Sequence, residues 1–435
     1  MNAVKKSDID FVMSSLTKYI EHIYKTKLFI PQEMFNVMEP VFTKAGYRQP
    51  PAGGGQNILI LTGAGMGDFI VVTPTIREIR RIYPNAHITL LVIPGFIPLA
   101  ETCPYVDELV IRPTEGDFTF STDLMILPQL LEKKFDIAFS TRTEKNFYPL
   151  MYMSGAKLRI ALDTFIEKID YKPEALQLRY FFGLATQMIP AWKFGTHAVD
   201  MFLSFVDYNL QLPVANRELE LWSTLYDRAQ AKNLVQNLSR PVYALMTGCS
   251  SLKRRYPAEK YARLVERILS EEPTATFINM GGGQADMQSA QILKEYLGEE
   301  IFNKHVINLV NRSNMRLDAA ILKHCDMYIG NNTGTLHLAS TSKCPVLVAE
   351  CFPADLESHF YDIPRFLGAY RVPSVSVQPK HALPECANNH PYNGYGCRSE
   401  QTHCIAQIEP ETLFKGFKLL KEIIAKNTCE HLFIS

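Results

Sequence analysis

The fold is decided by the stretch Asn57-Ile58-Leu59-Ile60-Leu61-Thr62-Gly63-Ala64-Gly65-Met66-Gly67-Asp68. Its first five residues form a continuous apolar run, as expected of a parallel strand that is covered on both faces. Glycines follow at the end of this strand, and then Ile76, Ile79 and Ile82 recur at helical spacing before a second apolar run at 87–93. A strand, a glycine loop, a helix and a strand form a βαβ unit. The sequence therefore predicts an α/β protein with a parallel sheet.

The same pattern restarts in the second half of the chain, after a proline-punctuated stretch at 212–222. Further strands are expected at 108–111, 136–140, 242–246, 274–280, 306–309, 327–330 and 345–349, with helices between them and a last helix at about 410–426. Two successive arrays predict two Rossmann-like, doubly wound domains. Ligands of such sheets bind at the carboxyl ends of the strands, so we expect the domains to face a shared cleft.

The predicted organisation has four parts: a helical N-terminal extension and linker at 1–56, a Rossmann-like acceptor domain at 57–222, a Rossmann-like donor-binding domain at 223–409, and a C-terminal helix at 410–435. Apolar residues recur at helical intervals within the first thirty residues, which indicates amphipathic helices. These helices either pack on the main body or contact an oligomer partner or a membrane surface.

Composition narrows the class of protein. The 435 residues are 47% hydrophobic and 21% charged, which is typical of a globular chain, and the formal net charge is zero. A neutral chain is not expected to bind nucleic acid, since that needs a basic excess. No apolar run is long enough to span a membrane, and no apolar segment typical of a signal peptide follows the first residues. Nine irregularly spaced cysteines favour a reducing compartment, so a cytoplasmic protein is expected.

Asp68 follows directly after the glycines of the first loop. The loop differs from the dinucleotide fingerprint G-x-G-x-x-G, because its third glycine, Gly67, comes one residue early. A carboxylate at the start of a helix is commonly a capping group. The alternative is a general base that takes a proton from an acceptor hydroxyl.

Phosphate-binding features are concentrated in the second array. The loop 330–335 precedes a short helix that contains His337, and free N–H groups at a helix start can hold a diphosphate. Lys253 and Arg254 follow the strand end 247–251 on the expected same edge of the sheet, where a cation can bind phosphate. A plain turn, a structural histidine and solvated cations are the alternatives.

With these loops in order, the chain resembles the ADP-heptose heptosyltransferases, family nine of the glycosyltransferases, which have the GT-B fold. The resemblance runs through about residues 57–425 and is strongest at 328–339. It rests on these segments: Gly65-Met66-Gly67-Asp68, Thr73-Pro74, Tyr83-Pro84, Asp136-Ile137-Ala138, His197-Ala198-Val199-Asp200, Lys253 to Pro257, Asn308 to Leu317, and Tyr328 to Ala339.

The resemblance implies an inverting, metal-independent transfer of heptose from an ADP-sugar, without a required cofactor. Asp68 would be the catalytic base, and Arg254 or the adjacent Lys253 would stabilise the leaving diphosphate. The expected donor-binding residues are Thr247, Ser250, Gly281, Gly282, Asn332, Thr333, Gly334, Thr335 and His337. The expected acceptor-binding residues are Met66, Gly67, Arg77, Arg142, Lys145 and His197, all taken as part of the N-terminal domain.

Two departures from the family pattern leave alternatives open. Thr333, Gly334 and His337 match the donor-binding motif of the family, but Asn332 replaces the aspartate of that motif. The identity of the donor sugar is therefore open, and a non-catalytic nucleotide-sugar binding protein is an alternative of another class. The N-terminal extension and the cysteine-containing region 386–404 admit a protein serine hydroxyl in place of a lipopolysaccharide core acceptor. Contact with the inner membrane and oligomer formation are also compatible with the resemblance. Iron or zinc bound at Cys351, Cys386, Cys397 and Cys404 is the alternative to unpaired thiols.

Overall fold

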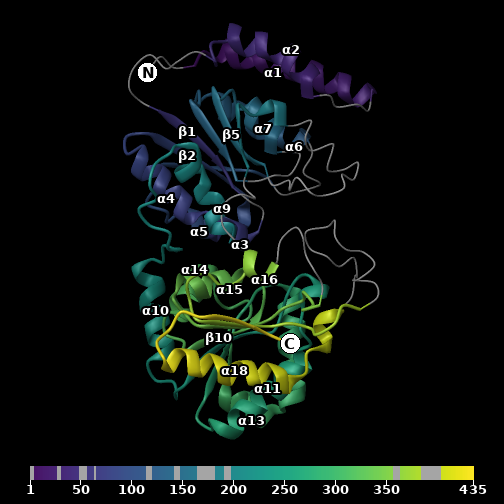
Figure 1. The fold of residues 1–435 in the computed structure, drawn as a ribbon. Coiled ribbons are helices and arrows are strands. Elements are labelled where there is room, and N and C mark those ends of the chain that lie inside the picture. The colour runs from purple at the N-terminus through teal and green to yellow at the C-terminus, as the bar shows by residue number, and fades with distance from the viewer. Residues whose placement is uncertain are drawn as a thin grey trace. The chain divides into compact units, whose positions relative to one another are not determined.

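The computed structural model describes residues 4–26, 31–48, 56–62, 65–113, 120–141, 147–163, 182–190, 197–355, 363–383 and 403–435. The chain divides into two compact units. The first comprises residues 1–195 and 199–217, and the second comprises 196–198 and 218–435. Each unit contains one sheet (Figure 1).

The first unit is built on a parallel sheet of six strands in the order β3-β2-β1-β4-β5-β6. The strands are β1 (Asn57–Leu61), β2 (His87–Val92), β3 (Glu108–Ile111), β4 (Ile137–Ser140), β5 (Leu158–Asp163) and β6 (Gln187–Pro190). This is the doubly wound order, in which the chain reverses direction across the sheet between β1 and β4. Asn57 to Leu61 pair with 87–91 in register, which confirms the predicted βαβ unit.

Helices cover both faces of this sheet. They are α3 (Met66–Ile70), α4 (Thr73–Ile82), α5 (Ile97–Ala100), α6 (Phe120–Leu131), α7 (Phe147–Met153) and α9 (Ala198–Ser204). Leu59 and Leu61 pack in one core cluster with residues of α6 and α7. Because side chains alternate along a strand, Ile58 and Ile60 point to the opposite face, and they are also fully buried.

The N-terminal extension forms α1 (Lys6–Thr26) and α2 (Pro31–Lys44). Val12, Leu16, Met38 and Phe42 are fully buried and belong to the same core cluster as α6 and α7. These helices therefore pack on the body of the first unit, which is the first of the two alternatives given for them above.

The second unit has a parallel sheet of seven strands in the order β13-β12-β11-β10-β7-β8-β9. The strands are β7 (Val242–Met246), β8 (Thr276–Asn279), β9 (Val306–Asn308), β10 (Met327–Asn331), β11 (Val346–Ala349), β12 (Ser374–Val377) and β13 (His431–Ile434). The winding is again double, and the reversal lies between β7 and β10, which pair directly. The predicted fold class of two Rossmann-like α/β sheets is confirmed.

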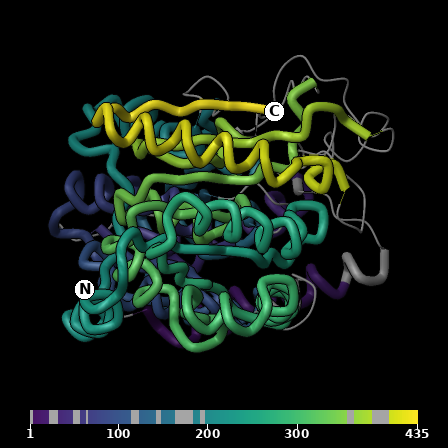
Figure 2. Tube along the Cα trace, turned by 90° about the horizontal axis from the view of Figure 1, so that it is seen from below, coloured from purple at the N-terminus to yellow at the C-terminus, as the bar shows by residue number. Residues whose placement is uncertain are grey.

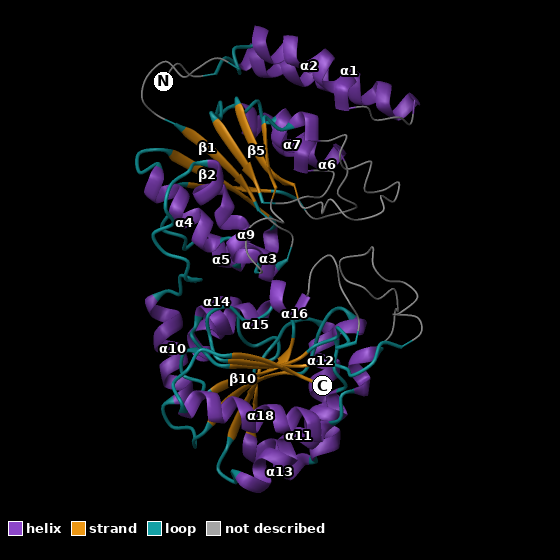
Figure 3. Cartoon of the chain, viewed as in Figure 1, coloured by secondary structure: helices purple, strands orange, loops and turns teal. Residues whose placement is uncertain are grey.

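Two helical layers enclose the second sheet (Figure 3). The helices are α10 (Leu225–Val235), α11 (Ala258–Glu271), α12 (Gln284–Leu297), α13 (Glu299–His305), α14 (Met315–Leu322), α15 (Gly334–Thr341), α16 (Ile363–Phe366) and α18 (Pro410–Ala425). Phe417 of α18 packs against Tyr243 of β7, with ring centroids 5.4 Å apart. The C-terminal helix and β13, which runs alongside it in Figure 2, thus belong to the second unit.

In the part of the chain that the structure describes, no helix is long and apolar enough to cross a membrane.

Candidate functional site

All strands of each sheet are parallel, so their carboxyl ends lie at one edge, and the predicted site residues can be located at these edges. In the second unit this edge carries the loop after β7 (247–257), the loop after β8 (280–283), the start of α15, and the segment after β11. The loops after β7 and β10 flank the point where the winding reverses. Doubly wound sheets bind ligands at this point.

Asn331 joins these two central loops. Its Nδ2 donates to the carbonyl oxygens of Gly248 at 3.0 Å and Thr247 at 3.2 Å, and its Oδ1 accepts from the Tyr256 N–H at 2.9 Å. Oδ1 also accepts from the Tyr261 hydroxyl at 3.2 Å. The side chain is fully buried. The end of β10 therefore fixes the course of the loop that carries Lys253 and Arg254.

The start of α15 offers unsatisfied backbone donors. Thr333 is the N-cap residue, and its side chain makes no capping hydrogen bond. The first N–H groups of a helix have no acceptor within the helix, and together with the positive end of the helix dipole they form a site for an anion. Gly334 and Thr335 occupy the first two positions of α15, and their N–H groups are the donors that the predicted phosphate-binding role would use.

His337 lies in the first turns of α15 and is buried. Burial, together with electrostatic contributions from the nearby His197 and Arg254, lowers the pKa of its imidazole to about 3. No residue in the described ranges makes a hydrogen bond to its buried Nδ1. A neutral imidazole with an unsatisfied nitrogen is therefore available to a polar ligand at this helix.

The cations of the loop after β7 lie in the short 3₁₀ helix η5 (Leu252–Arg254), and both side chains are half-buried. Arg254 acts electrostatically on His337 and on the Cys351 thiol, whereas Lys253 acts on Cys351. Of the two cations, Arg254 is thus the one that acts on the helix α15, through His337.

The loop after β8 is held by a residue that the sequence analysis missed. The Asp286 carboxylate accepts a hydrogen bond from the N–H of Gly282 at 2.7 Å. A Cβ atom at Gly248 would lie 1.9 Å from Asp286 Oδ1, and Gly281 has a positive φ of 139°. Both glycines are therefore required for the close approach of these loops. An acid three residues into a helix that follows a glycine run is the signal that could have identified Asp286.

The remaining predicted donor residues divide by exposure. Thr247 is buried, and its hydroxyl lies 3.5 Å from Asn279 Oδ1, whereas Ser250 is exposed. Asn332 is buried and donates from Nδ2 to both carboxylate oxygens of Glu350, each at 3.1 Å. Glu350, directly after β11, was not identified from the sequence.

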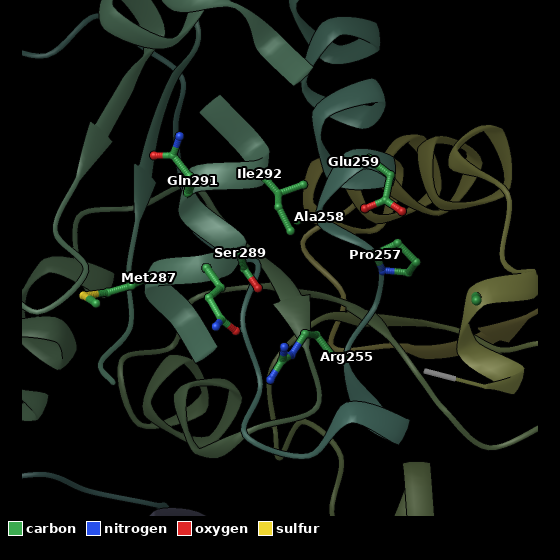
Figure 4. Close-up of a pocket in the computed structure, with 10 residues that line it drawn as sticks. Arg255, Pro257, Ala258, Glu259, Met287, Ser289, Gln291 and Ile292 are labelled. Carbon is green, nitrogen blue, oxygen red and sulfur yellow. The ribbon is translucent and has the colours of Figure 1, made fainter. Parts of the chain in front are cut away.

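A pocket of about 830 Å³ opens beside this edge, between the starts of α11 and α12 (Figure 4). In Figure 4 the Arg255 side chain points toward the residues of α12, and its Nε donates to the Cys249 carbonyl at 2.7 Å. None of the predicted donor-binding residues lines this pocket.

In the first unit, Asp68 is the third residue of α3, at the carboxyl end of β1 and hence beside the reversal between β1 and β4. Its Oδ2 accepts a hydrogen bond from the Gly65 N–H at 3.1 Å, and the side chain is half-buried. Met66 and Gly67 form the first two positions of the same helix. The structure thus shows the capping contact, and the base function of Asp68 stays a prediction.

The other predicted acceptor residues have varied positions. Arg77 lies on α4, and its guanidinium donates to the Asn216 carbonyl at 2.6 Å. This contact links α4 to the segment around Asn216. His197 groups with the second unit instead of the first: its Nε2 lies 3.2 Å from the Gly368 carbonyl, and its ring packs on Tyr370. The assignment of His197 to the N-terminal domain is thereby corrected. Arg142 and Lys145 lie outside the described residues.

The proposed cysteine metal site falls partly outside the described residues, since Cys386 and Cys397 are not among them. Cys351 and Cys404 are present as free thiols. Within the described ranges, no group of three or more histidine, cysteine or acidic side chains could hold a metal ion.

Comparison with known proteins shows which proteins this chain is similar to. Residues 171–348 match the family described as glycosyltransferase family 9 (heptosyltransferase). A relative in Haemophilus influenzae, lipooligosaccharide heptosyltransferase 2, is 20% identical over 310 residues, which cover 67% of this chain and 82% of the relative.

Two solved structures share the architecture. The glycosyltransferase family 9 protein from Veillonella parvula is 18% identical with a TM-score of 0.64, covering 84% of this chain and 97% of the other. The ADP-heptose lipopolysaccharide heptosyltransferase II of E. coli is 15% identical with a TM-score of 0.62, covering 86% and 100%. The predicted GT-B fold is confirmed, and residues 171–348 are similar to glycosyltransferase family 9.

Proposed function

We propose that this chain is a family 9 glycosyltransferase that transfers a heptose from an ADP-sugar to a hydroxyl of a lipopolysaccharide core acceptor. The names of the relatives support the donor and acceptor classes, since they include an ADP-heptose lipopolysaccharide heptosyltransferase and a lipooligosaccharide heptosyltransferase. The observation that carries the proposal is the convergence of the α15 N-terminus, neutral His337 and Arg254 at the reversal point of the second sheet.

The second unit would bind the donor. The diphosphate would accept hydrogen bonds from the N–H groups of Gly334 and Thr335, with Arg254 as counter-charge. Because the site gathers helix N–H groups and a cation, it can stabilise the charge that develops on the departing ADP without a metal ion. His337, held neutral by burial, would hydrogen-bond the donor through an imidazole nitrogen.

The first unit would supply the base. Asp68 would take the proton of the acceptor hydroxyl as that oxygen attacks the anomeric carbon from the side opposite the diphosphate. The new C–O bond forms while the bond from the anomeric carbon to the phosphate oxygen breaks, so the configuration inverts. The capping contact from Gly65 to Oδ2 would hold the carboxylate in place as it receives the proton.

Seven free cysteines in the described residues, five of them buried with one half-buried and one exposed, support a reducing compartment such as the cytoplasm as the site of this reaction.

Mass spectrometry of the product tests the proposal. The purified chain would be incubated with ADP-, UDP- and GDP-sugars and with two acceptors, a truncated lipopolysaccharide core and a serine-containing protein. We expect a heptose adduct on the lipopolysaccharide core with ADP-heptose alone. An adduct on the protein alone would show that the acceptor is a protein hydroxyl. If the wild type releases no more ADP than the Asp68→Ala variant, the chain is a nucleotide-sugar binding protein.

A further inference from the structure

A buried carboxylate lies at the donor edge of the second sheet without a role in the steps above. Glu350 follows β11 directly, its backbone N–H donates to the Val377 carbonyl at 2.9 Å, and its side chain has no exposed surface. Burying an ionised carboxylate is costly unless polar groups compensate for the lost water. Such a group is therefore expected to hold another part of the site in place.

Asn332 is one group that Glu350 holds. The Asn332 Nδ2 donates to both carboxylate oxygens at 3.1 Å, and Asn332 itself is only 6% exposed. The opposite amide orientation would place Oδ1 against the carboxylate and is repulsive, so the chemistry fixes which atom faces Glu350. The amide is planar, and Oδ1 consequently points away from Glu350.

The position of Asn332 connects this pair with the donor. Asn332 directly precedes Thr333, the N-cap of α15, where the diphosphate is proposed to bind. In the described residues, no group donates a hydrogen bond to Asn332 Oδ1. A carboxylate near this point would repel a phosphate, so the part of the donor next to the pair is expected to be uncharged.

We propose that Glu350 is a positioning residue, which holds the Asn332 amide so that Oδ1 accepts a hydrogen bond from a hydroxyl of the donor sugar. This inference rests on the proposed function of the site as an ADP-sugar site. The inference also gives Asn332 a function of its own. The carboxylate lies at position 350, and the neutral amide oxygen of Asn332 faces the sugar.

The test exchanges the two groups. Calorimetry would measure the affinity for ADP and, without acceptor, for ADP-heptose in the wild type, in Asn332→Asp, in Glu350→Gln and in the double variant. Asn332→Asp places two carboxylates about 3 Å apart, which is strongly unfavourable. The double variant restores one carboxylate and one amide with donor and acceptor reversed.

We expect Asn332→Asp to bind ADP-heptose about tenfold or more weakly, Glu350→Gln to lose about threefold or more, and the double variant to recover most of the wild-type affinity. ADP alone should bind each variant within about threefold of the wild type, which shows that the nucleotide site is folded.

The Asn332→Asp variant should also show a pH dependence that the wild type lacks. Two carboxylates in contact share a proton because the pKa of one is raised, so affinity for ADP-heptose should recover as the pH falls through that value. Glu350 acts electrostatically on Tyr261, Tyr328 and Cys351, whose pKa values are raised, and the cations Arg254 and Lys253 act on Cys351.

Three results would overturn the inference: wild-type affinity for ADP-heptose in the single variants, no recovery in the double variant, or equal losses for ADP and ADP-heptose. A wild-type protein that binds neither compound would instead refute the proposed function, and the inference with it.

Discussion

Replacement of Asn331 by alanine should destabilise the second unit and loosen the donor site together. The substitution removes the acceptor of two buried donors, the Tyr256 N–H at 2.9 Å and the Tyr261 hydroxyl at 3.2 Å, as well as the donor to the carbonyls of Thr247 and Gly248. A buried donor without a partner costs about 1–3 kcal/mol. Two such donors give an expected loss of about 4 kcal/mol in the free energy of unfolding.

Urea unfolding followed by circular dichroism measures this loss from the shift in the midpoint, with the m-value checked for constancy. Asn308→Ala is the matched control, because Asn308 Oδ1 accepts two contacts at 3.3 Å, from Asn279 Nδ2 and from the Val310 N–H, and its side chain is only half-buried. The control should lose about 1 kcal/mol. Equal losses in the two variants, or unchanged ADP affinity in a folded Asn331→Ala protein, would refute the reasoning.

Three further predictions concern charge. Arg254→Ala should lower kcat by about 100-fold or more, because a cation that stabilises the leaving diphosphate is worth several kcal/mol in the transition state; steady-state kinetics at saturating donor measures this, and an unchanged kcat excludes the role. His337 should make the protein less stable as the pH falls from about 6.5 toward 3, because the unfolded chain binds a proton that the folded site, with its pKa near 3, does not; His337→Gln should flatten the pH profile of unfolding in this range, and an unaltered profile contradicts the assignment. Arg112→Ala should lower the free energy of unfolding by about 3–5 kcal/mol, because it leaves the buried Asp123 carboxylate without the guanidinium that now lies 2.7 Å from it; a loss below about 1 kcal/mol in urea unfolding contradicts this.

The strands with strong apolar runs were predictable from the sequence. The runs at 57–61 and 242–246 have the same bounds as β1 and β7, and each is followed by a glycine loop. Such strands are covered on both faces, so their composition alone reveals them. The last helix was also predicted to within a residue at each end.

Other elements depend on pairing with distant parts of the chain. The strand β13 has only four residues, and it pairs with β12, which lies more than fifty residues earlier. β12 itself, Ser-Val-Ser-Val, is short and half polar. Neither has a local pattern long enough to distinguish a strand from a loop, so the sequence analysis ended the sheet at 345–349.

The site shows the same division. The turn at 330–337 and the cations at 253–254 could be found because glycine, threonine and basic residues follow strand ends. Asn331, Asp286 and Glu350 could not, since each acts by contacting a loop distant in sequence. The placement of His197 was missed for a related reason: the residue follows the first array in sequence, but its contacts with Gly368 and Tyr370 come from the second.

The most direct measurement of the central claim is the transfer rate of the Asp68→Asn variant at saturating ADP-heptose and acceptor, with ADP affinity measured in parallel. Asp227→Asn is the control, because Asp227 is also a third-position carboxylate that caps a helix, through the Thr224 N–H at 2.8 Å. If Asp68 takes the acceptor proton, its variant should lose transfer by about 100-fold or more while binding ADP normally, and the control should lose stability but keep turnover. An Asp68→Asn enzyme that transfers heptose as fast as the wild type would show that the carboxylate is only a helix cap.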